Sequence, residues 1–243
     1  MHQKEYLGLN SIKNLATILS KHEPKKIFLV TGEDSYVKSG AKAILGKILY
    51  KYNLTRFFDF ETNPNISDIK RGFKSLKKNN CDFVIGVGGG SVMDVAKSIN
   101  CFAANDNRPE DYLAKKKSIA KKGKTLVAIP TTAGSGSEAT KFAVIYINKT
   151  KYSLDNELIL PDYAIVDPQF IMNLPKSITA SAGMDALSQG IESYWCINST
   201  DESKKYAEEA ITIAIENLAK AVNGDKQSRI AMARAAHLAG KAI

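Results

Sequence analysis

The sequence predicts an α/β protein in which a parallel sheet is followed by an all-helical region. In the first half of the chain, short apolar runs alternate with amphipathic stretches of helical length. This alternation is typical of right-handed βαβ units in a parallel sheet. From residue 177 onward, nearly every stretch has a helical pattern. We therefore predict an α/β domain over residues 1–175 and the beginning of a helical domain over residues 176–243.

The elements of the first domain can be assigned in order along the chain. Apolar, β-rich runs predict strands at residues 27–31, 56–60, 82–87, 125–129, 142–147 and 163–166. Amphipathic stretches predict helices at residues 36–50, 66–77 and 92–102. The polar segment 148–157 separates the last two strands, which indicates a β excursion rather than a further βαβ unit.

The helical region begins with a helix expected at residues 177–194. Residues 199–202 (Ser-Thr-Asp-Glu) predict a capping box that opens a second helix, which reaches about residue 222. Asp225 is expected to cap a third helix. No Gly or Pro stop signal ends that helix before Ile243. We therefore expect the chain to be a fragment of a longer protein.

The composition is that of a globular protein. Hydrophobic residues make up 44% and charged residues 24% of the 243 residues, which excludes long disorder. No apolar run approaches the ~18 residues of a membrane span, and no secretory signal is visible. The 3 cysteines form no CxxC pair, so neither a disulfide framework nor a cysteine metal site is indicated. We expect a cytoplasmic enzyme with no membrane partner.

The net charge of +9 comes largely from lysines within residues 115–124. A nucleic-acid interface would explain such a patch, but no aromatic residue is interleaved there and no recognition motif accompanies it. We therefore expect no nucleic-acid partner. A solvated surface loop accounts for the lysines, and a positive field that attracts anionic cofactors or substrates is a further interpretation.

A glycine-rich segment, GVGGGSVMD at residues 86–94, follows the third predicted strand. Three successive glycines allow a ligand to approach the backbone closely, because no Cβ is in the way. Ser91 is expected to cap the next helix, with Asp94 as its capping-box partner. The free amides and the helix dipole would then bind a pyrophosphate. A tight turn without a ligand needs only two glycines, so phosphate binding is favoured, although the segment is not the usual GxGxxG fingerprint.

Two further segments carry polar groups that can converge on a ligand. Residues 130–138 (PTTAGSGSE) follow the fourth predicted strand, and ligands bind at the carboxyl ends of parallel strands. With the glycine segment, they would form the two lips of a cofactor crevice. Asp185 and Gln189 are four positions apart in a predicted helix and so share one face. Alone, this pair would be interpreted as a surface pair.

The segments GGGSVMDVAKSI, IPTTAGSGSEAT, LPDYAIVDP and GMDALSQGIESY, in this order and spacing, resemble the iron-containing alcohol dehydrogenase family. The resemblance extends from about residue 25 to residue 243. It implies a Rossmann-like N-terminal domain, a helical C-terminal domain of dehydroquinate synthase-like architecture, and a divalent metal between them. It also implies contacts with NAD or NADP, carried over to Asn63, Gly89, Gly90, Ser91, Asp94, Thr131, Thr132, Ser135, Thr140 and Lys151.

The resemblance implies a metal site that this sequence only partly matches. The family holds Fe²⁺ or Zn²⁺ with an Asp and a His four positions apart, and with two later histidines. Asp185 matches the first ligand, but Gln189 stands at the second position, and an amide is a poorer ligand than imidazole for these metals. His237 lies too early to match a later histidine and is assigned to packing. The later ligands are expected beyond residue 243.

The choice between NAD and NADP stays open in the sequence. Many members of the family have an acidic residue after the first strand that bonds the adenosine ribose. Gly32 stands where that acid is commonest, and Glu33 and Asp34 are the candidates to replace it.

The resemblance implies reversible hydride transfer between the nicotinamide and a small alcohol or aldehyde, with the metal as Lewis acid. The DALSQ variant is similar to members that reduce phosphonoacetaldehyde, so an anionic substrate is expected, and the protein is expected to be a homodimer. Two alternatives are retained. One is an enzyme like glycerol-1-phosphate dehydrogenase or dehydroquinate synthase, and the other is a non-catalytic nucleotide-binding fragment.

Overall fold

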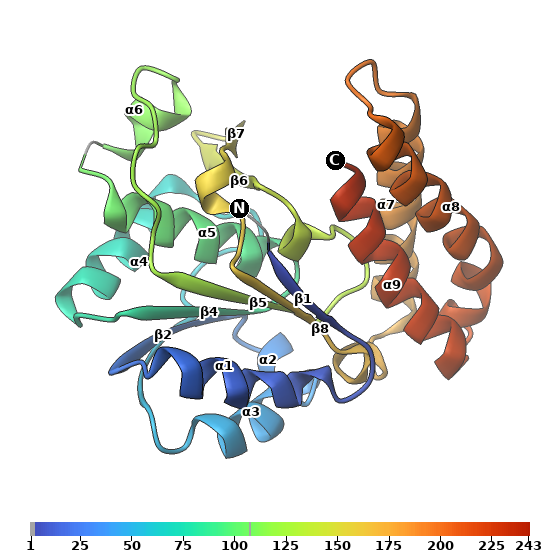
Figure 1. Ribbon diagram of the computed structural model, residues 1–243, viewed down its shortest axis with the longest axis horizontal. Helices are drawn as coiled ribbons and strands as arrows, with labels where there is room; N and C mark the ends of the chain where they lie inside the picture. Colours follow the sequence, from blue (N-terminus) through green and yellow to red (C-terminus); the bar gives the residue numbers. More distant parts are fainter. Residues whose placement is uncertain (1–2, 107) are drawn as a thin grey trace.

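A six-stranded parallel sheet forms the centre of the computed structural model, which describes residues 3–106 and 108–243 (Figure 1). The strand order is β1-β8-β5-β4-β2-β3, and every neighbouring pair is parallel. The strands are β1 (Lys4–Leu7), β2 (Lys26–Thr31), β3 (Asn53–Phe57), β4 (Phe83–Gly88), β5 (Thr125–Pro130) and β8 (Tyr163–Val166). The predicted α/β fold with a parallel sheet is confirmed.

Helices cover both faces of this sheet (Figure 1). One face carries α1 (Asn14–His22), α2 (Ser35–Lys38) and α3 (Ala41–Leu49), and the other carries α4 (Ile66–Lys78) and α5 (Gly90–Ala104), which is followed by the short α6 (Pro109–Leu113). Successive side chains of a strand point to opposite faces. Phe28 and Val84 therefore pack against α4 and α5, whereas Leu29 and Ile85 pack against α1 and α3.

The strand order reverses between β2 and β4. From β2 the chain moves outward to β3, and it then returns to place β4 on the other side of β2. In open α/β sheets, such a reversal leaves a crevice outside the carboxyl ends of the two strands, where ligands bind. The loop after β2 and the glycines after β4 both lie at this point.

A two-stranded hairpin extends from the sheet domain. It consists of β6 (Phe142–Ile147) and β7 (Thr150–Asp155), which pair antiparallel across a turn in which Asn148 and Lys149 have positive φ angles of 48° and 67°. The backbone N–H of Tyr146 donates to the carbonyl of Pro64 at 2.9 Å, which holds the hairpin against the loop before α4. The predicted β excursion is confirmed, but the polar strand β7 was not predicted.

Three antiparallel helices form the C-terminal part: α7 (Lys176–Trp195), α8 (Asp201–Val222) and α9 (Lys226–Ala242). Small residues lie at their contacts, so the helices approach closely; the buried alanines include Ala186, Ala207, Ala210, Ala214, Ala221, Ala233 and Ala236. Asp225 caps α9 as predicted, since its side chain accepts from the Ser228 amide at 2.7 Å. In the part of the chain that the structure describes, no helix is long and apolar enough to cross a membrane.

Several predicted boundaries were wrong. The strand expected at residues 56–60 lies three residues earlier, as β3. The helix expected at residues 36–50 is interrupted at Gly40, whose φ of 79° is left-handed and ends α2 before α3 begins. The capping box of α8 is formed by Thr200 and Ser203 rather than by residues 199–202, because Thr200 accepts from the Ser203 amide at 3.1 Å. β1 and α1 were not predicted at all.

The segment 131–140, here called the threonine loop, lies between the sheet and the helical part. It leaves β5 and contains a short 3-10 helix, η2 (Ser137–Ala139). Gly134 contacts Ala182 of α7, because a Cβ at Gly134 would lie 2.9 Å from the backbone there. Gly136, with a φ of 57°, is similarly close to Gly240 of α9. The threonine loop is therefore the element through which the two parts of the molecule meet.

The close approach of Gly136 and Gly240 predicts that Gly240→Ala is destabilising. The added Cβ would lie 2.3 Å from the Gly136 carbonyl oxygen, which is backbone and cannot rotate away. We expect a loss of about 1–3 kcal/mol of unfolding free energy, as for other overpacked sites. Urea denaturation followed by circular dichroism measures it.

The matched control is Gly46→Ala in α3, where a Cβ meets no atom within 4 Å. This exchange is expected to be neutral or stabilising by up to ~1 kcal/mol, because alanine is the better helix former. Equal stability of Gly240→Ala and the wild type would contradict the close approach of the threonine loop and α9.

Candidate functional site

The glycine loop, residues 88–90, connects β4 to α5. Gly89 is the N-cap of α5, and the helix begins at Gly90. The predicted capping box was wrong, because no side chain caps this helix. Ser91 instead donates its hydroxyl to the carbonyl of Thr62, and Asp94 accepts from elsewhere. The first amides of a helix have no intrahelical partner, so an uncapped start leaves them available to an anion.

The threonine loop lies directly against the glycine loop. The Thr131 amide donates to the Gly88 carbonyl at 2.9 Å. A Cβ at Gly89 would lie 3.3 Å from Thr132, and one at Gly90 would lie 2.9 Å from the hydroxyl of Ser135. The two loops predicted to form the lips are therefore in contact, which the lack of side chains on the glycines allows. That they enclose a cofactor stays a prediction.

The remaining predicted cofactor residues are placed around these loops. Asn63 is exposed in the loop before α4, beside the Thr62 carbonyl that holds Ser91. Lys151 is exposed on β7, close enough to Asp94 to affect its pKa. Thr140 is buried, and its hydroxyl is engaged by another side chain of the protein. The cofactor contacts of all these residues stay predictions.

That other side chain is Lys97, which was not predicted as a site residue. Its side chain is only 1% exposed. The ammonium donates to the Ser137 hydroxyl at 3.0 Å, the Thr140 hydroxyl at 2.9 Å and the Phe142 carbonyl at 2.8 Å. A signal was present in the sequence, since Lys97 follows two apolar residues in a helix predicted to pack on the sheet, and a lysine buried there must be paired. Its partners are distant in sequence and could not be read from it.

Burial dominates the electrostatics beside Lys97. It raises the pKa of Asp94 to about 6, although Lys97 and the Ser137 hydroxyl, which donates to Asp94 at 3.1 Å, act in the opposite direction. Burial lowers the pKa of Lys97 to about 8, against the attraction of Asp94 and Glu138. Both groups therefore titrate closer to neutrality than exposed ones, which is common at functional sites.

The loop after β2 is organised by Arg56 of β3, another residue that was not predicted. Its Nε donates to the Thr31 hydroxyl at 2.8 Å, and its Nη2 donates to the Gly32 carbonyl at 3.1 Å. The guanidinium lies 4.4 Å from the ring centroid of Phe58. Asp34, a candidate to replace the ribose-binding acid, is exposed and paired with Lys38 at 2.6 Å. The Arg56 guanidinium is thus held at the loop where the family resemblance implies an acidic residue.

The predicted metal pair lies on α7, where Asp185 is exposed and Gln189 is partly buried. Gln189 also lines a cavity of about 560 Å³ between the hairpin and the helical part, together with Thr140 and Ser193. Across residues 3–106 and 108–243, no group of three His, Cys, Asp or Glu side chains is placed to hold a metal. One carboxylate and one amide are too few for a complete metal site, so the described residues alone do not fit a bound Fe²⁺ or Zn²⁺ ion.

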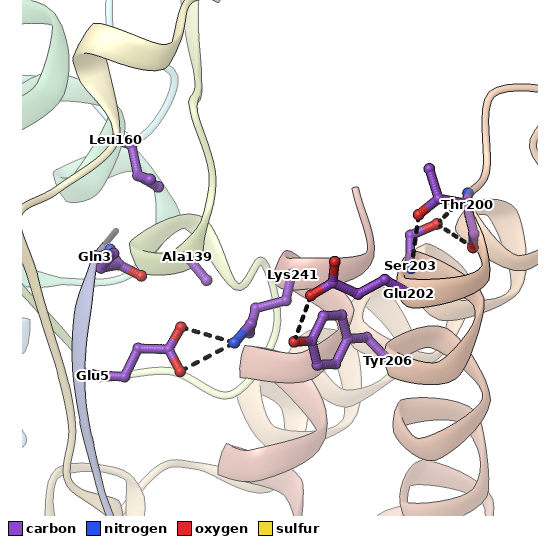
Figure 2. A pocket seen from close by; sticks show the side chains of 9 residues that line it. All are labelled: Gln3, Glu5, Ala139, Leu160, Thr200, Glu202, Ser203, Tyr206 and Lys241. Atoms are coloured by element: carbon purple, nitrogen blue, oxygen red, sulfur yellow. Dashed lines mark hydrogen bonds and ion pairs between the residues drawn. The ribbon is translucent and has the colours of Figure 1, made fainter. Parts of the chain in front are cut away.

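A second buried charge cluster joins the two parts of the molecule at α9. His237, 1% exposed, contacts Glu138 of the threonine loop at 3.0 Å and Glu5 of β1 at 3.4 Å. Glu5 also pairs with Lys241 at 3.0 Å, beside a cavity of about 500 Å³ that Tyr206 lines from α8 (Figure 2). His237 is buried as its assignment to packing implied, but it is also the centre of an ionic contact between α9, η2 and β1.

The pKa values follow from these contacts. Burial would lower the pKa of His237, but the carboxylates of Glu138 and Glu5 outweigh it and raise the pKa to about 9. The contact with His237 lowers the pKa of Glu5 to about 2, against the effect of its own burial. The imidazole of His237 is therefore protonated at neutral pH, beside the ionised carboxylate of Glu5.

Two family models match the chain. Residues 3–168 match the model described as "Iron-containing alcohol dehydrogenase". Residues 179–243 match the model described as "Fe-containing alcohol dehydrogenase family, C-terminal". The two matches together include the glycine loop, the threonine loop and all three helices of the C-terminal part.

Curated relatives and solved structures are similar over nearly the whole chain. Long-chain-alcohol dehydrogenase 1 of Geobacillus thermodenitrificans is 34% identical over 98% of this chain and 62% of its own length. The NAD-dependent methanol dehydrogenase of Bacillus methanolicus is 37% identical over 98% of this chain and 63% of its own length. The chain thus spans less than two thirds of the length of these relatives. The sulfoacetaldehyde reductase of Bifidobacterium kashiwanohense, solved with NAD⁺, is 30% identical, with a TM-score of 0.92 over 99% of this chain and 65% of that chain.

The buried cluster predicts a pH-dependent contribution of His237 to stability. Its folded-state pKa of about 9 lies above the ordinary value of 6.5. The contribution is therefore complete below pH ~6.5 and is lost as the pH rises toward the folded-state value. We expect the difference in unfolding free energy between wild type and His237→Gln to shrink from pH 6.5 to 9, by at most ~1.4 kcal/mol per pH unit.

Urea titrations at several pH values measure this difference. Comparing the variant with the wild type removes the titration of Asp94 and Lys97, which both proteins share. Glu138→Gln, which removes one of the two carboxylates, should weaken the same pH dependence. A difference that stays constant from pH 6.5 to 9 would show that His237 is not charged in the folded protein.

Proposed function

This chain belongs to the iron-containing alcohol dehydrogenase family, and from that premise we propose that it binds a nicotinamide dinucleotide in the crevice between the glycine loop and the threonine loop. The observation that carries the proposal is the uncapped start of α5 at Gly90, opposite the hydroxyls of Thr132 and Ser135. An uncapped helix start at a strand-order reversal is an anion site suited to a pyrophosphate. NAD-dependent relatives support the choice of ligand.

The proposed reaction is hydride transfer between the nicotinamide and a small alcohol or aldehyde. The cofactor supplies the redox chemistry, and the protein supplies binding and orientation. The glycine loop would hold the pyrophosphate, and Ser91 and Asn63 lie beside it. Asp94 is also assigned to the pyrophosphate loop by the family resemblance and lies next to the buried amine of Lys97, and Lys151 is proposed as a further cofactor contact.

For the substrate, we propose an aldehyde with an anionic group, such as phosphonoacetaldehyde. Two observations support this choice. One is the net charge of +9, which favours anions. The other is the likeness to a sulfoacetaldehyde reductase, whose named substrate is an anionic aldehyde. A homodimer stays our prediction from the family resemblance.

Asp185 and Gln189 are retained as a proposed pair of metal ligands. A working site needs further donors, which the described residues do not supply. This favours a second candidate function for residues 1–243 taken alone, namely cofactor binding without turnover. Turnover by residues 1–243, with Fe²⁺ or Zn²⁺ supplied, would exclude that second candidate, whereas cofactor binding alone would support it.

If this proposal is right, Gly90→Val weakens cofactor binding. The new side chain would collide with Ser135 and cover the start of α5, since even a Cβ would lie 2.9 Å from that hydroxyl. Titration with NADH and NADPH, followed by nucleotide fluorescence, should show binding by the wild type. The variant should bind at least ~10-fold more weakly, which is about 1.4 kcal/mol.

Gly46→Ala, far from the crevice in α3, is the control and should bind like the wild type. Circular dichroism should show that Gly90→Val is folded, and the smaller exchange Gly90→Ala is the substitute if it is not. Wild-type protein that binds neither nucleotide would refute the proposed function.

The fixed cation at Arg56 predicts that NADPH is accepted as well as NADH. An arginine at the adenosine end of a dinucleotide site accommodates the 2′-phosphate of NADP, whereas an acid there binds the free hydroxyl of NAD. Gly32 stands where the acidic residue is commonest, and the Arg56 guanidinium donates to the carbonyl of Gly32 in the loop after β2. Arg56→Gln should therefore weaken NADPH more than NADH, by ~10-fold in the ratio of the two dissociation constants.

Because Arg56 also supports the loop structurally, a loss of binding for both nucleotides is expected alongside the change in ratio. Arg56→Lys keeps the charge and should retain more NADPH binding than the Gln variant. An unchanged NADPH-to-NADH ratio in Arg56→Gln would show that the guanidinium does not face the 2′ position.

A further inference from the structure

Lys97 is a fully buried ammonium on the same helix that presents the glycine loop. Burying a charge is unfavourable unless it is paired and hydrogen-bonded. A lysine has three N–H donors, and here all three have acceptors: the Ser137 hydroxyl, the Thr140 hydroxyl and the Phe142 carbonyl. The ammonium is therefore saturated with hydrogen bonds.

The position of these acceptors is more informative than their number. None of them lies on α5, which carries Lys97. Two lie in the threonine loop, and the third is the first residue of β6. The Lys97 amine therefore joins α5, which follows the glycine loop, to the threonine loop and the start of β6.

The charged groups around the Lys97 amine likewise come from both α5 and the threonine loop. Asp94 lies one turn earlier on α5 and accepts from the Ser137 hydroxyl, which itself accepts from Lys97. Glu138 of the threonine loop also attracts the amine and is held on its far side by His237 of α9. Lys151 of β7 approaches Asp94 from the hairpin. Lys97 is thus the cation between a partly buried carboxylate, Asp94, and a buried one, Glu138, which belong to different lips.

All three acceptors of Lys97 lie in the threonine loop or two residues after it, so its contacts concentrate on one lip of the site. Resting on the proposed cofactor site, we propose that Lys97 is a positioning residue for the dinucleotide, which holds the threonine loop and Asp94 in the geometry that binds the cofactor. A neutral side chain at this position would leave the hydroxyls of Ser137 and Thr140 without their donor. The threonine loop would then move relative to the glycine loop, and the cofactor would bind more weakly.

Lys97→Met, which preserves the length of the side chain without its charge, tests this proposal by NADH titration. We expect the dissociation constant to rise at least ~10-fold. The matched control is Ile99→Ala, a fully buried residue of the same helix that faces Gly72 of α4 rather than the threonine loop. It should lower the melting temperature but leave NADH affinity within about twofold, as expected for a distant, independent site.

A double-mutant cycle tests whether the effect runs through the threonine loop. Thr140→Val removes the hydroxyl in the wild type and in Lys97→Met. The effects of substitutions at contacting residues are not additive. The loss of NADH affinity caused by Thr140→Val should therefore be clearly smaller in Lys97→Met than in the wild type. Full additivity of the two losses would overturn the assigned route.

The pH profile gives a readout that a merely structural role would not change. A neutral amine has only two N–H donors, so wild-type affinity for NADH should weaken as the pH rises through about 8, where Lys97 titrates. Lys97→Arg, whose guanidinium stays protonated, should lose this dependence even if its larger side chain weakens binding. The same pH profile in wild type and Lys97→Arg would count against the proposal.

Hydrogen exchange in the free protein separates failure of this inference from failure of the proposed function. If Lys97 holds the threonine loop, amides of residues 131–140 exchange faster in Lys97→Met than in Ile99→Ala, with or without a cofactor. Unchanged exchange there, or an NADH affinity of Lys97→Met equal to that of the wild type, would overturn the inference. Wild-type protein that binds no nucleotide would overturn the proposed function and this inference together.

Discussion

The threonine loop is fixed from both sides, and the rest of the molecule depends on that constraint. On one side, the ammonium of Lys97 binds two of its hydroxyls. On the other, Gly136 meets Gly240 of α9 so closely that neither position has room for a Cβ. The loop is the connection between the sheet and the helical bundle, and it is also one lip of the proposed cofactor crevice. Its position therefore couples the packing of the two parts to the shape of the binding site.

Two kinds of residue make this arrangement possible. Glycines remove the side chains that would keep the two loops apart, at Gly89 and Gly90 as well as at Gly136. Charged groups then connect the loops, and losing one partner of such a contact is destabilising because it leaves an uncompensated charge inside the protein. The charges extend from Asp94 and Lys97 through Glu138 to His237, which links the helix of the glycine loop to α9. A substitution at Asp94 can therefore affect His237 through these contacts.

The sequence was sufficient for the fold and for the segments of the site, because both depend on local patterns. Alternating strands and helices predict the parallel sheet, and the two segments that follow the third and fourth predicted strands predict the two lips. The sequence could not reveal hydrogen-bond partners that lie far apart in the chain. Ser91 has the residue type of a cap but donates to Thr62, and Lys97 reaches partners about forty positions away. Arg56 was missed because its partners lie on the neighbouring strand.

We infer that the glycine loop and the threonine loop form a single cofactor site. Hydrogen exchange with and without saturating NADH tests it most directly, because it reports on both loops in one experiment. We expect the amides of residues 88–92 and 131–140 to gain protection together, at the same NADH concentration. Protection confined to one loop, or spread evenly over the whole chain, would contradict a site built from these two lips.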